Sequence, residues 1–481
     1  MSTRQVFCAI LSLSMFLGLY HVATAKSIPT DAEPSKQAQE EDDIKEWNNQ
    51  IRRDKFDLIL PQVMRKNNID MWIYVMREAI PDTFGAGELG STSGVFIFTD
   101  RGGDRIERAI LGRRWGASHR GRVEWETKVV EECGAYDIIG DPVFVKEPVG
   151  SPMTEYDYRF KGLREFVEAR DPNRIAVNYR HDLGPYPTSY RETAIDGISH
   201  TDYLLLTEEI GDEYANRLVS SEYVMMDYII RKVPSEIKLI KRMRKDKVEH
   251  TKKVFAGIVP GITRNSEARV TVFRRMSTGI SQDIRSRRDV VIQGGDIVGV
   301  PYQGMYAYVL REGETEPPPE IKKLWAEYRK IDKILAETIK VGLTAREIIQ
   351  NYKRKFEDAG IIVRDNQLHM VQPKNNFPVY SAGFDPEKTH LSIDCHGIKG
   401  RREMDSENYC PRIGSLGPDW QKDIPLPPNH HFVLEYFFYM PSVSSECEDQ
   451  YLFWWDHEQA IATESGVEYL SPPQKELYLI H

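Results

Sequence analysis

Short apolar runs alternate with stretches of helical spacing through the first half of the chain. Apolar side chains at near-helical spacing from Ile51 to Val63 predict a helix, and the run Met71-Trp72-Ile73-Tyr74-Val75 predicts a buried strand. Further strands are expected at 94–98, 108–111 and 174–178, with a helix at 158–169 before the last of them. This alternation predicts an α/β domain in the amino-terminal half.

The second half combines a long amphipathic helix with dense β-branched and aromatic runs. Apolar side chains follow three-four spacing from Ile321 to Ile339, and Gly342 closes that helix. Thr344 and Glu347 form a capping box that starts another helix. Strands are expected at 296–310 and 431–440. The fold class is therefore predicted to be α/β (α+β), in two domains.

The boundary between the two domains is placed near Arg231. A helical stretch is predicted over 214–230, and Val233-Pro234-Ser235-Glu236 then reads as a strong helix start. Proline occupies the first turn of that helix, and Ser235 is a candidate cap. The predicted domains are residues 47–231 and 232–481.

The first 46 residues are predicted to lie outside both domains. Residues 1–25 have a positive start at Arg4, an apolar run over 7–19 and the small-residue site Ala23-Thr24-Ala25, as in a secretory signal peptide. Residues 26–46 are polar without an apolar period and are predicted to be a flexible leader. No later run is long enough to span a membrane. We therefore expect a secreted or periplasmic protein with no stable membrane span after signal cleavage.

Charge and cysteine content narrow the partners further. The 481 residues carry a formal net charge of −9, which argues against the broad basic face that nucleic-acid binding needs. After removal of the signal peptide the remaining cysteines are Cys133, Cys395, Cys410 and Cys447. In an oxidising compartment one disulfide among the last three is one interpretation, and buried free thiols are the other.

Four short segments follow one another in the second half. They are Val233-Pro234-Ser235-Glu236-Ile237, Gly295-Asp296-Ile297-Val298, the stretch 341–348 and Cys395-His396-Gly397-Ile398, and they are followed by Val433-Leu434-Glu435 and the stretch 462–468. In this order and spacing they resemble the carboxy-terminal domain of the X-Pro aminopeptidase, prolidase and creatinase family, whose architecture is called the pita-bread fold. The amino-terminal half is similar to the creatinase-like, non-catalytic domain of the two-domain members.

The resemblance implies a hydrolase that cleaves the peptide bond before proline with a metal-activated water. Peptide-cleaving members hold two divalent metals, such as Mn, Co or Zn, with two Asp, one His and two Glu side chains, a donor set suited to hard cations. Members are commonly dimers, so a homodimer is expected as well.

The ligand positions of this chain depart from that pattern. His396 matches the His ligand and Glu435 the first Glu, which makes both the expected catalytic residues, while His457 takes the place of the second Glu. The place of the first Asp holds Pro301, which has no ligand atom in its side chain. The second Asp falls on Arg311 or on Glu312, so Glu312 is included in the expected metal set.

The three retained candidates also have structural interpretations. His396 is either a metal ligand or a hydrogen-bonded core residue, and His457 is either a ligand or a surface residue. Glu435 lies on a predicted buried strand, where an unpaired carboxylate would be costly, so it should keep a partner: a cation, His396 or a nearby arginine.

Candidate substrate-binding residues lie around them. His390 is six residues before His396, so on a strand it would share that residue's face and lie in the pocket. Trp455 is expected to line a ligand site, with core packing as the alternative. Tyr302, Tyr306 and Tyr308 alternate along an expected strand and are interpreted as sheet packing.

Three functions are compatible with these residues. The first is an X-Pro aminopeptidase-like metallopeptidase that acts on peptides. The second is a catalytically inactive pseudoenzyme that binds a peptide or small amine in the old cavity. The third is a metal-free, creatinase-like amidinohydrolase of a small molecule.

Overall fold

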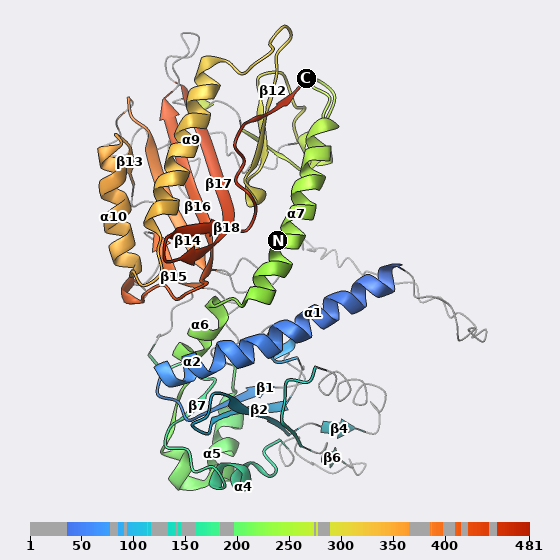
Figure 1. Ribbon diagram of the computed structural model, residues 1–481, viewed down its shortest axis with the longest axis vertical. Coiled ribbons are helices and arrows are strands. Elements are labelled where there is room, and N and C mark those ends of the chain that lie inside the picture. The colour runs from blue at the N-terminus through green and yellow to red at the C-terminus, as the bar shows by residue number, and fades with distance from the viewer. Residues whose placement is uncertain are drawn as a thin grey trace, which may run out of the picture. The chain divides into compact units, whose positions relative to one another are not determined.

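The chain folds into mixed sheets and helices in a computed structural model (Figure 1). It describes residues 36–76, 85–90, 94–112, 114–116, 133–140, 143–145, 159–182, 197–273, 276–277, 289–364, 385, 387–397, 409–414, 422–441 and 450–481. Lys45–His481 form one compact unit. Among the described helices none is long and apolar enough to cross a membrane. The predicted signal peptide, 1–25, lies outside the described residues.

A six-stranded sheet is built from residues of the first half. Its order is β5 (Ile138–Ile139), β3 (Ile106–Leu111), β2 (Gly94–Asp100), β1 (Met71–Met76), β7 (Ile175–Val177) and β8 (Leu218–Ser220). The strand β2 runs antiparallel to its two neighbours β1 and β3, whereas β7 pairs with β1, and β8 with β7, in parallel. A separate two-stranded ladder joins β4 (Arg114–Gly116) to β6 (Val143–Val145).

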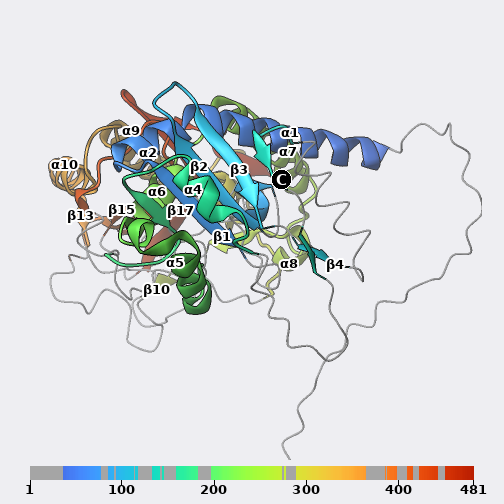
Figure 2. The same ribbon diagram turned by 90° about the horizontal axis from the view of Figure 1, so that it is seen from below.

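Helices pack on both faces of this sheet, so its central strands are buried on both sides (Figure 2). One face packs against α1 (Lys36–Leu58), α2 (Leu60–Lys66) and α6 (Glu222–Ile230). The other packs against α4 (Leu163–Glu168) and α5 (His200–Ala215). The predicted strands and the α/β character of this half are confirmed, although α4 is shorter than the helix expected at 158–169.

Two further sheets form the second half. The larger has the order β10 (Met276–Ser277), β17 (Gln450–Thr463), β16 (His431–Pro441), β14 (His390–Gly397) and β13 (Ile362–Val363), with β15 (Tyr409–Gly414) on β14 and β18 (Gly466–Tyr469) on β17. The smaller has the order β19 (Tyr478–Ile480), β12 (Met305–Val309), β11 (Ile297–Val300) and β9 (Thr271–Phe273). A short 3-10 turn, η3 (Pro301–Gln303), joins β11 to β12.

Amphipathic helices cover one face of the larger sheet. The helices α9 (Pro319–Thr338) and α10 (Ala345–Asp358) pack their apolar stripes against it (Figure 1). The smaller sheet packs against α7 (Pro234–Ala256), and the short α8 (Asn265–Ala268) follows. The long helix, the capping box and the helix start at Pro234 are therefore confirmed.

Three local predictions need correction. Helix α1 begins at Lys36, inside the stretch predicted as a leader, because its Lys, Gln, Ala and Glu residues favour a helix even without an apolar period. The helical stretch expected at 214–230 is interrupted by β8, which adds an edge strand to β7. Ser235 does not cap α7; its hydroxyl pairs with the carboxylate of Asp54. The domain boundary near Arg231 falls between α6 and α7 and stays a prediction.

Cys395 does not form a disulfide. Cys133 and Cys395 are buried and neither forms a disulfide, and the Cys395 Sγ lies 3.9 Å from the backbone oxygen of Glu435. Cys395 points into the core between the larger sheet and its helices, where burial raises the pKa of its thiol well above the usual range. Of the two interpretations, the buried thiol is therefore correct for Cys395 and a disulfide through this residue is wrong. The side chain of Cys410, and Cys447, lie outside the described residues.

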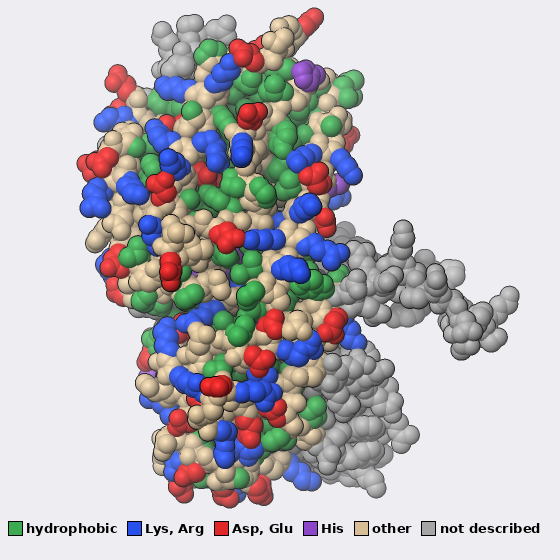
Figure 3. All heavy atoms as spheres, in the orientation of Figure 1, with side chains coloured by type: hydrophobic (Ala, Val, Ile, Leu, Met, Phe, Trp, Pro, Cys, Tyr) green, Lys and Arg blue, Asp and Glu red, His purple; other side chains and the backbone are tan. Residues whose placement is uncertain are grey.

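The surface shows charges of both signs. In the view of Figure 3 the Lys and Arg side chains are interspersed with Asp and Glu over the described part of that face. The described part of the face in this view is therefore not predominantly basic.

The capping box of α10 offers a direct test of local stability. The Thr344 hydroxyl accepts from the Glu347 backbone N–H, and the Glu347 carboxylate accepts from the Thr344 N–H at 2.8 Å. Thr344→Ala is expected to lower the free energy of unfolding by about 1 kcal/mol, because a backbone donor of the first turn loses its acceptor. Urea unfolding measures this, and Thr344→Ser, which keeps the hydroxyl, should match wild type. Equal losses in both variants would contradict the capping role.

Candidate functional site

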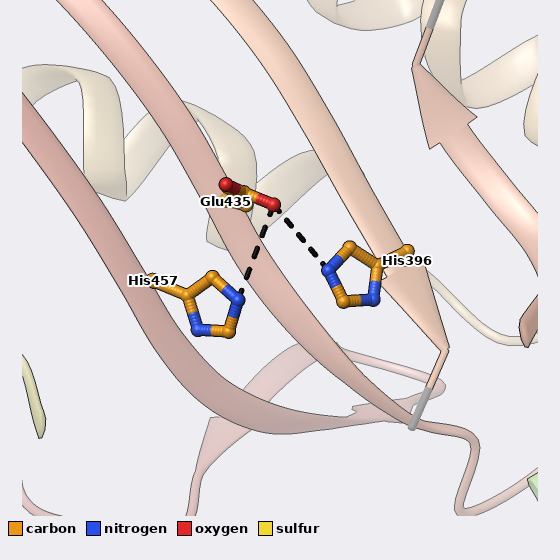
Figure 4. A group of neighbouring side chains, drawn as sticks. All are labelled: His396, Glu435 and His457. Atoms are coloured by element: carbon orange, nitrogen blue, oxygen red, sulfur yellow. Dashed lines mark ion pairs between the residues drawn. The ribbon is translucent and has the colours of Figure 1, made fainter. Parts of the chain in front are cut away.

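Three adjacent strands of the larger sheet bring His396, Glu435 and His457 together (Figure 4). Glu435 on β16 is directly opposite His457 on β17. His396 on β14 pairs with Val433, two residues before Glu435, so the three side chains share one face. One ligand atom from each residue lies within 4.8 Å of the other two. We call these residues the His–Glu–His group.

The two faces of these strands differ in chemistry. Leu434 and Tyr436 flank Glu435 and point into the apolar core beneath α9 and α10. The period of two along the strand then turns Glu435 to the face that these helices do not cover. His396 and His457 are buried, and Glu435 is nearly so. The carboxylate of Glu435 therefore lies on the face of the sheet opposite to α9 and α10.

The proton position on His396 indicates what lies between it and Glu435. The Nδ1 atom is 3.2 Å from the backbone oxygen of Gly397, and because a carbonyl only accepts, Nδ1 donates the proton. The Nε2 atom faces the Glu435 Oε2 at 3.3 Å. In a neutral imidazole this would set a lone pair against a carboxylate oxygen. A proton shared between the two atoms, or a cation held between them, would satisfy this contact.

His457 has the neutral ring that a metal ligand needs. Its Nε2 lies 4.0 Å from the same Oε2 atom of Glu435. Burial lowers the pKa of His457 to about 4, although the Glu435 carboxylate raises it. At neutral pH its ring is uncharged, as a metal ligand must be. Of the two interpretations of His457, the surface position is wrong, because the residue is buried.

The donor set fits one divalent cation. Two imidazoles and one carboxylate hold zinc in many catalytic sites, with the fourth position open. Ligand atoms at about 2.0–2.1 Å from a tetrahedral ion lie roughly 3.3–3.4 Å apart. The 3.3 Å separation of His396 from Glu435 meets this value, and the 4.0 Å separation of His457 needs a small inward movement. The hydrogen bond from His396 Nδ1 to a backbone carbonyl is the usual way in which a ligating imidazole is oriented.

A pair of cations is not supported by the described residues. Pro301 begins η3, the turn beside His457, and offers no ligand atom there. Glu312 lies on an exposed turn beyond the other end of β12, which is roughly 13 Å away along the strand. The expectation that Glu312 joins the metal set is therefore not met. Arg311 is also outside, where it pairs with Glu314 at 3.1 Å.

His390 lies at the far end of β14 from the group. Six residues of strand separate it from His396 by roughly 20 Å. Its Nε2 is within hydrogen-bond distance of the backbone of Asp385, at 2.7 Å from the oxygen, and burial lowers its pKa. Sharing a face was correctly inferred, but the length of the strand removes His390 from the pocket.

Trp455 lies next to the group, as expected of a substrate-binding residue. Its ring centre is 6.3 Å from that of His457 and stacks on Phe437 at 5.8 Å. Tyr302 was misread as part of an alternating strand; it lies in η3, where its ring is 4.6 Å from His457. The proline before it was the signal that the strand ends there.

Two more histidines, His430 and His431, lie at the start of β16 as buried structural residues. Burial lowers the pKa of His430 to about 3, well below the value of about 6.5 in an unfolded chain. Its contribution to stability is therefore complete above about pH 6.5 and is lost as the pH falls toward 3.

His430→Phe is expected to reduce this acid sensitivity, because phenylalanine keeps the stacking on Phe432 but cannot bind a proton. Between about pH 6 and pH 4 the free energy of unfolding should fall less steeply than in wild type, by up to about 1.4 kcal/mol per pH unit. Urea unfolding in EDTA across this range measures the slope. The exposed His250→Gln is the matched control. An unchanged slope in His430→Phe would rule out the assignment.

Comparisons with known proteins add the following. No protein-family model matches the chain, and no curated protein does. Among solved structures, the X-Pro aminopeptidase from Thermotoga maritima MSB8 is 14% identical, with 87% of this chain and 100% of that chain covered and a TM-score of 0.49. The Xaa-Pro dipeptidase from Bacillus anthracis is 14% identical, with 90% and 99% covered and a TM-score of 0.46. Both are proteins to which this chain is similar, at low sequence identity.

Proposed function

We propose that this chain is a metal-dependent hydrolase of the X-Pro peptidase kind, in which the His–Glu–His group holds a single divalent cation. The observation that carries the proposal is the convergence of three ligand atoms within 4.8 Å on one face of the sheet. The substrate class comes from the order and spacing of the sequence motifs. A homodimer is part of the same proposal and rests on that resemblance alone.

Each residue of the group has a distinct role. A bound divalent cation supplies Lewis acidity and lowers the pKa of water. The Glu435 carboxylate offsets part of the positive charge. His457 is neutral at neutral pH, so its ring accepts a cation without releasing a proton. The Gly397 carbonyl keeps the His396 Nε2 atom directed at the same point.

A second candidate function is favoured by Pro301. With no ligand atom at the first Asp position, a second cation lacks its donors among the described residues. A pseudoenzyme that binds peptide without hydrolysis would keep the His–Glu–His group as a structural cation site. A metal-free amidinohydrolase would instead place a proton between His396 and Glu435.

Metal titration followed by a cleavage assay tests the proposal. Protein stripped with EDTA is titrated with Zn²⁺, Mn²⁺ and Co²⁺ by calorimetry, and Ala-Pro and Gly-Pro peptides are then incubated with the loaded protein. We expect one equivalent of cation and cleavage that chelation abolishes. One equivalent without cleavage would favour the pseudoenzyme. No bound cation would overturn the proposal, and hydrolysis of guanidino substrates would then identify the metal-free enzyme.

A further inference from the structure

An aromatic surface leads up to the His–Glu–His group. The rings of Phe437 on β16 and Trp455 on β17 stack nearly parallel, with a 4° interplanar angle. Tyr302 in η3 continues the surface, edge to face with Trp455 at 5.3 Å and with His457 at 4.6 Å. Two consecutive strands and a turn far before them in the sequence thus place aromatic rings in a row that ends at a candidate metal ligand.

Tyr302 is the accessible member of this row. Its residue is 50% exposed, whereas Phe437 is buried and Trp455 partly buried. Tyr306 and Tyr308, the next aromatic residues along the chain, are fully buried in the core. An exposed aromatic ring beside a buried polar group matches the composition of small-ligand sites, where apolar walls surround a few polar groups.

The turn that presents Tyr302 is held from behind. The guanidinium of Arg244 reaches the Tyr302 backbone oxygen at 3.5 Å, and the Thr251 hydroxyl bonds the Gln303 side chain at 2.7 Å. Gly304 ends the turn with φ of 61°, and a Cβ there would lie 2.0 Å from the Glu458 carboxylate. The ring therefore stands on a fixed turn, which is what a selective subsite needs.

We propose that Tyr302 and Trp455, with the buried ring of Phe437 stacked on Trp455, form a subsite that receives a large apolar or aromatic side chain on the residue before proline. This inference rests on the proposed function, because it assumes an X-Pro peptide. Proline is common to all such peptides, so the preceding side chain is the part whose size the subsite discriminates. The ring of Tyr302 contacts that side chain while the His–Glu–His group faces the adjacent carbonyl.

The test compares the binding of Phe-Pro and Gly-Pro, which differ only in that side chain. Calorimetry is done in EDTA, where the proposed hydrolysis does not occur. Wild type is expected to bind Phe-Pro about tenfold more tightly, because the phenylalanine ring makes aromatic contacts that glycine cannot make. Tyr302→Ala should reduce the ratio to near one, and Tyr302→Phe should keep it. Tyr223→Ala, which removes another exposed tyrosine, should also keep the wild-type ratio.

Failure of the subsite and failure of the proposed function give different results. Three results would overturn the subsite even if the protein binds zinc and cleaves X-Pro bonds. They are equal affinities of wild type for Phe-Pro and Gly-Pro, an unchanged affinity ratio in Tyr302→Ala, and no binding of either peptide. A preference for Phe-Pro that Tyr302→Ala abolishes would support the subsite even if neither cation binding nor cleavage is found.

Discussion

Glu435→Gln is expected to lower the affinity of the protein for Zn²⁺ by more than about 100-fold, since even the loss of an outer-shell partner costs 10–100-fold. Glutamine keeps the size of the side chain but removes the charge that the His–Glu–His group offers to a cation. Zinc should then no longer stabilise the variant. For wild type the stabilisation is about 2.7 kcal/mol when the zinc concentration is 100 times the Kd.

Calorimetry and thermal unfolding with and without zinc measure both effects. The matched control is Glu312→Gln, an identical change at the exposed residue that the sequence motifs also assigned to the metal. This control should bind zinc as wild type does. Wild-type binding by Glu435→Gln, or loss of binding in Glu312→Gln, would contradict the site as described.

Arg244→Met is expected to lower the free energy of unfolding by roughly 3 to 5 kcal/mol, because it leaves the Glu458 carboxylate buried without its cationic partner. The Arg244 Nη2 atom is 3.5 Å from the Glu458 Oε1 atom, and both side chains are almost fully buried. Burial raises the pKa of Glu458, and Arg244 is among the groups that lower it. The same guanidinium bonds the Ser471 hydroxyl at 2.7 Å.

Urea unfolding at pH 7 measures this loss. The double variant Arg244→Met/Glu458→Gln removes both charges and should recover much of the stability. Lys241 lies on α7, as Arg244 does, and forms an exposed ion pair with Glu468 on β18. The substitution Lys241→Met breaks that exposed pair and should have little effect on stability. A small loss in Arg244→Met, comparable with that in Lys241→Met, would show that the buried pair contributes little.

The elements predicted correctly are those specified by neighbours in sequence. The strand Met71–Met76 and the helix α9 have apolar periods that only one type of element can bury. The box of Thr344 and Glu347 closes over a single turn. The helix that begins at Lys36 was not predicted, because it rests on the helix propensity of its residues and has no apolar period.

The candidate site was only partly predictable. Motif spacing selected His396, Glu435 and His457, and the fold brings these three side chains together, because residues at fixed offsets on long paired strands keep their register. It was wrong for Glu312 and His390, because spacing says which face a residue shares but not at which end of a strand a ligand is needed. Tyr302 was missed, because its exposure depends on where Pro301 ends β11.

From the sequence alone, the α/β class, most strands and helices and the three members of the His–Glu–His group could be derived, since these depend on local periodicity and motif order. Only the folded chain decided that one carboxylate lies between two imidazoles and that an exposed tyrosine stands beside them. The separation of atoms across strands depends on register and strand length. The position of Tyr302 depends on the contact of its backbone oxygen with Arg244, which lies on a helix distant in sequence. These are long-range contacts, and no local pattern encodes them.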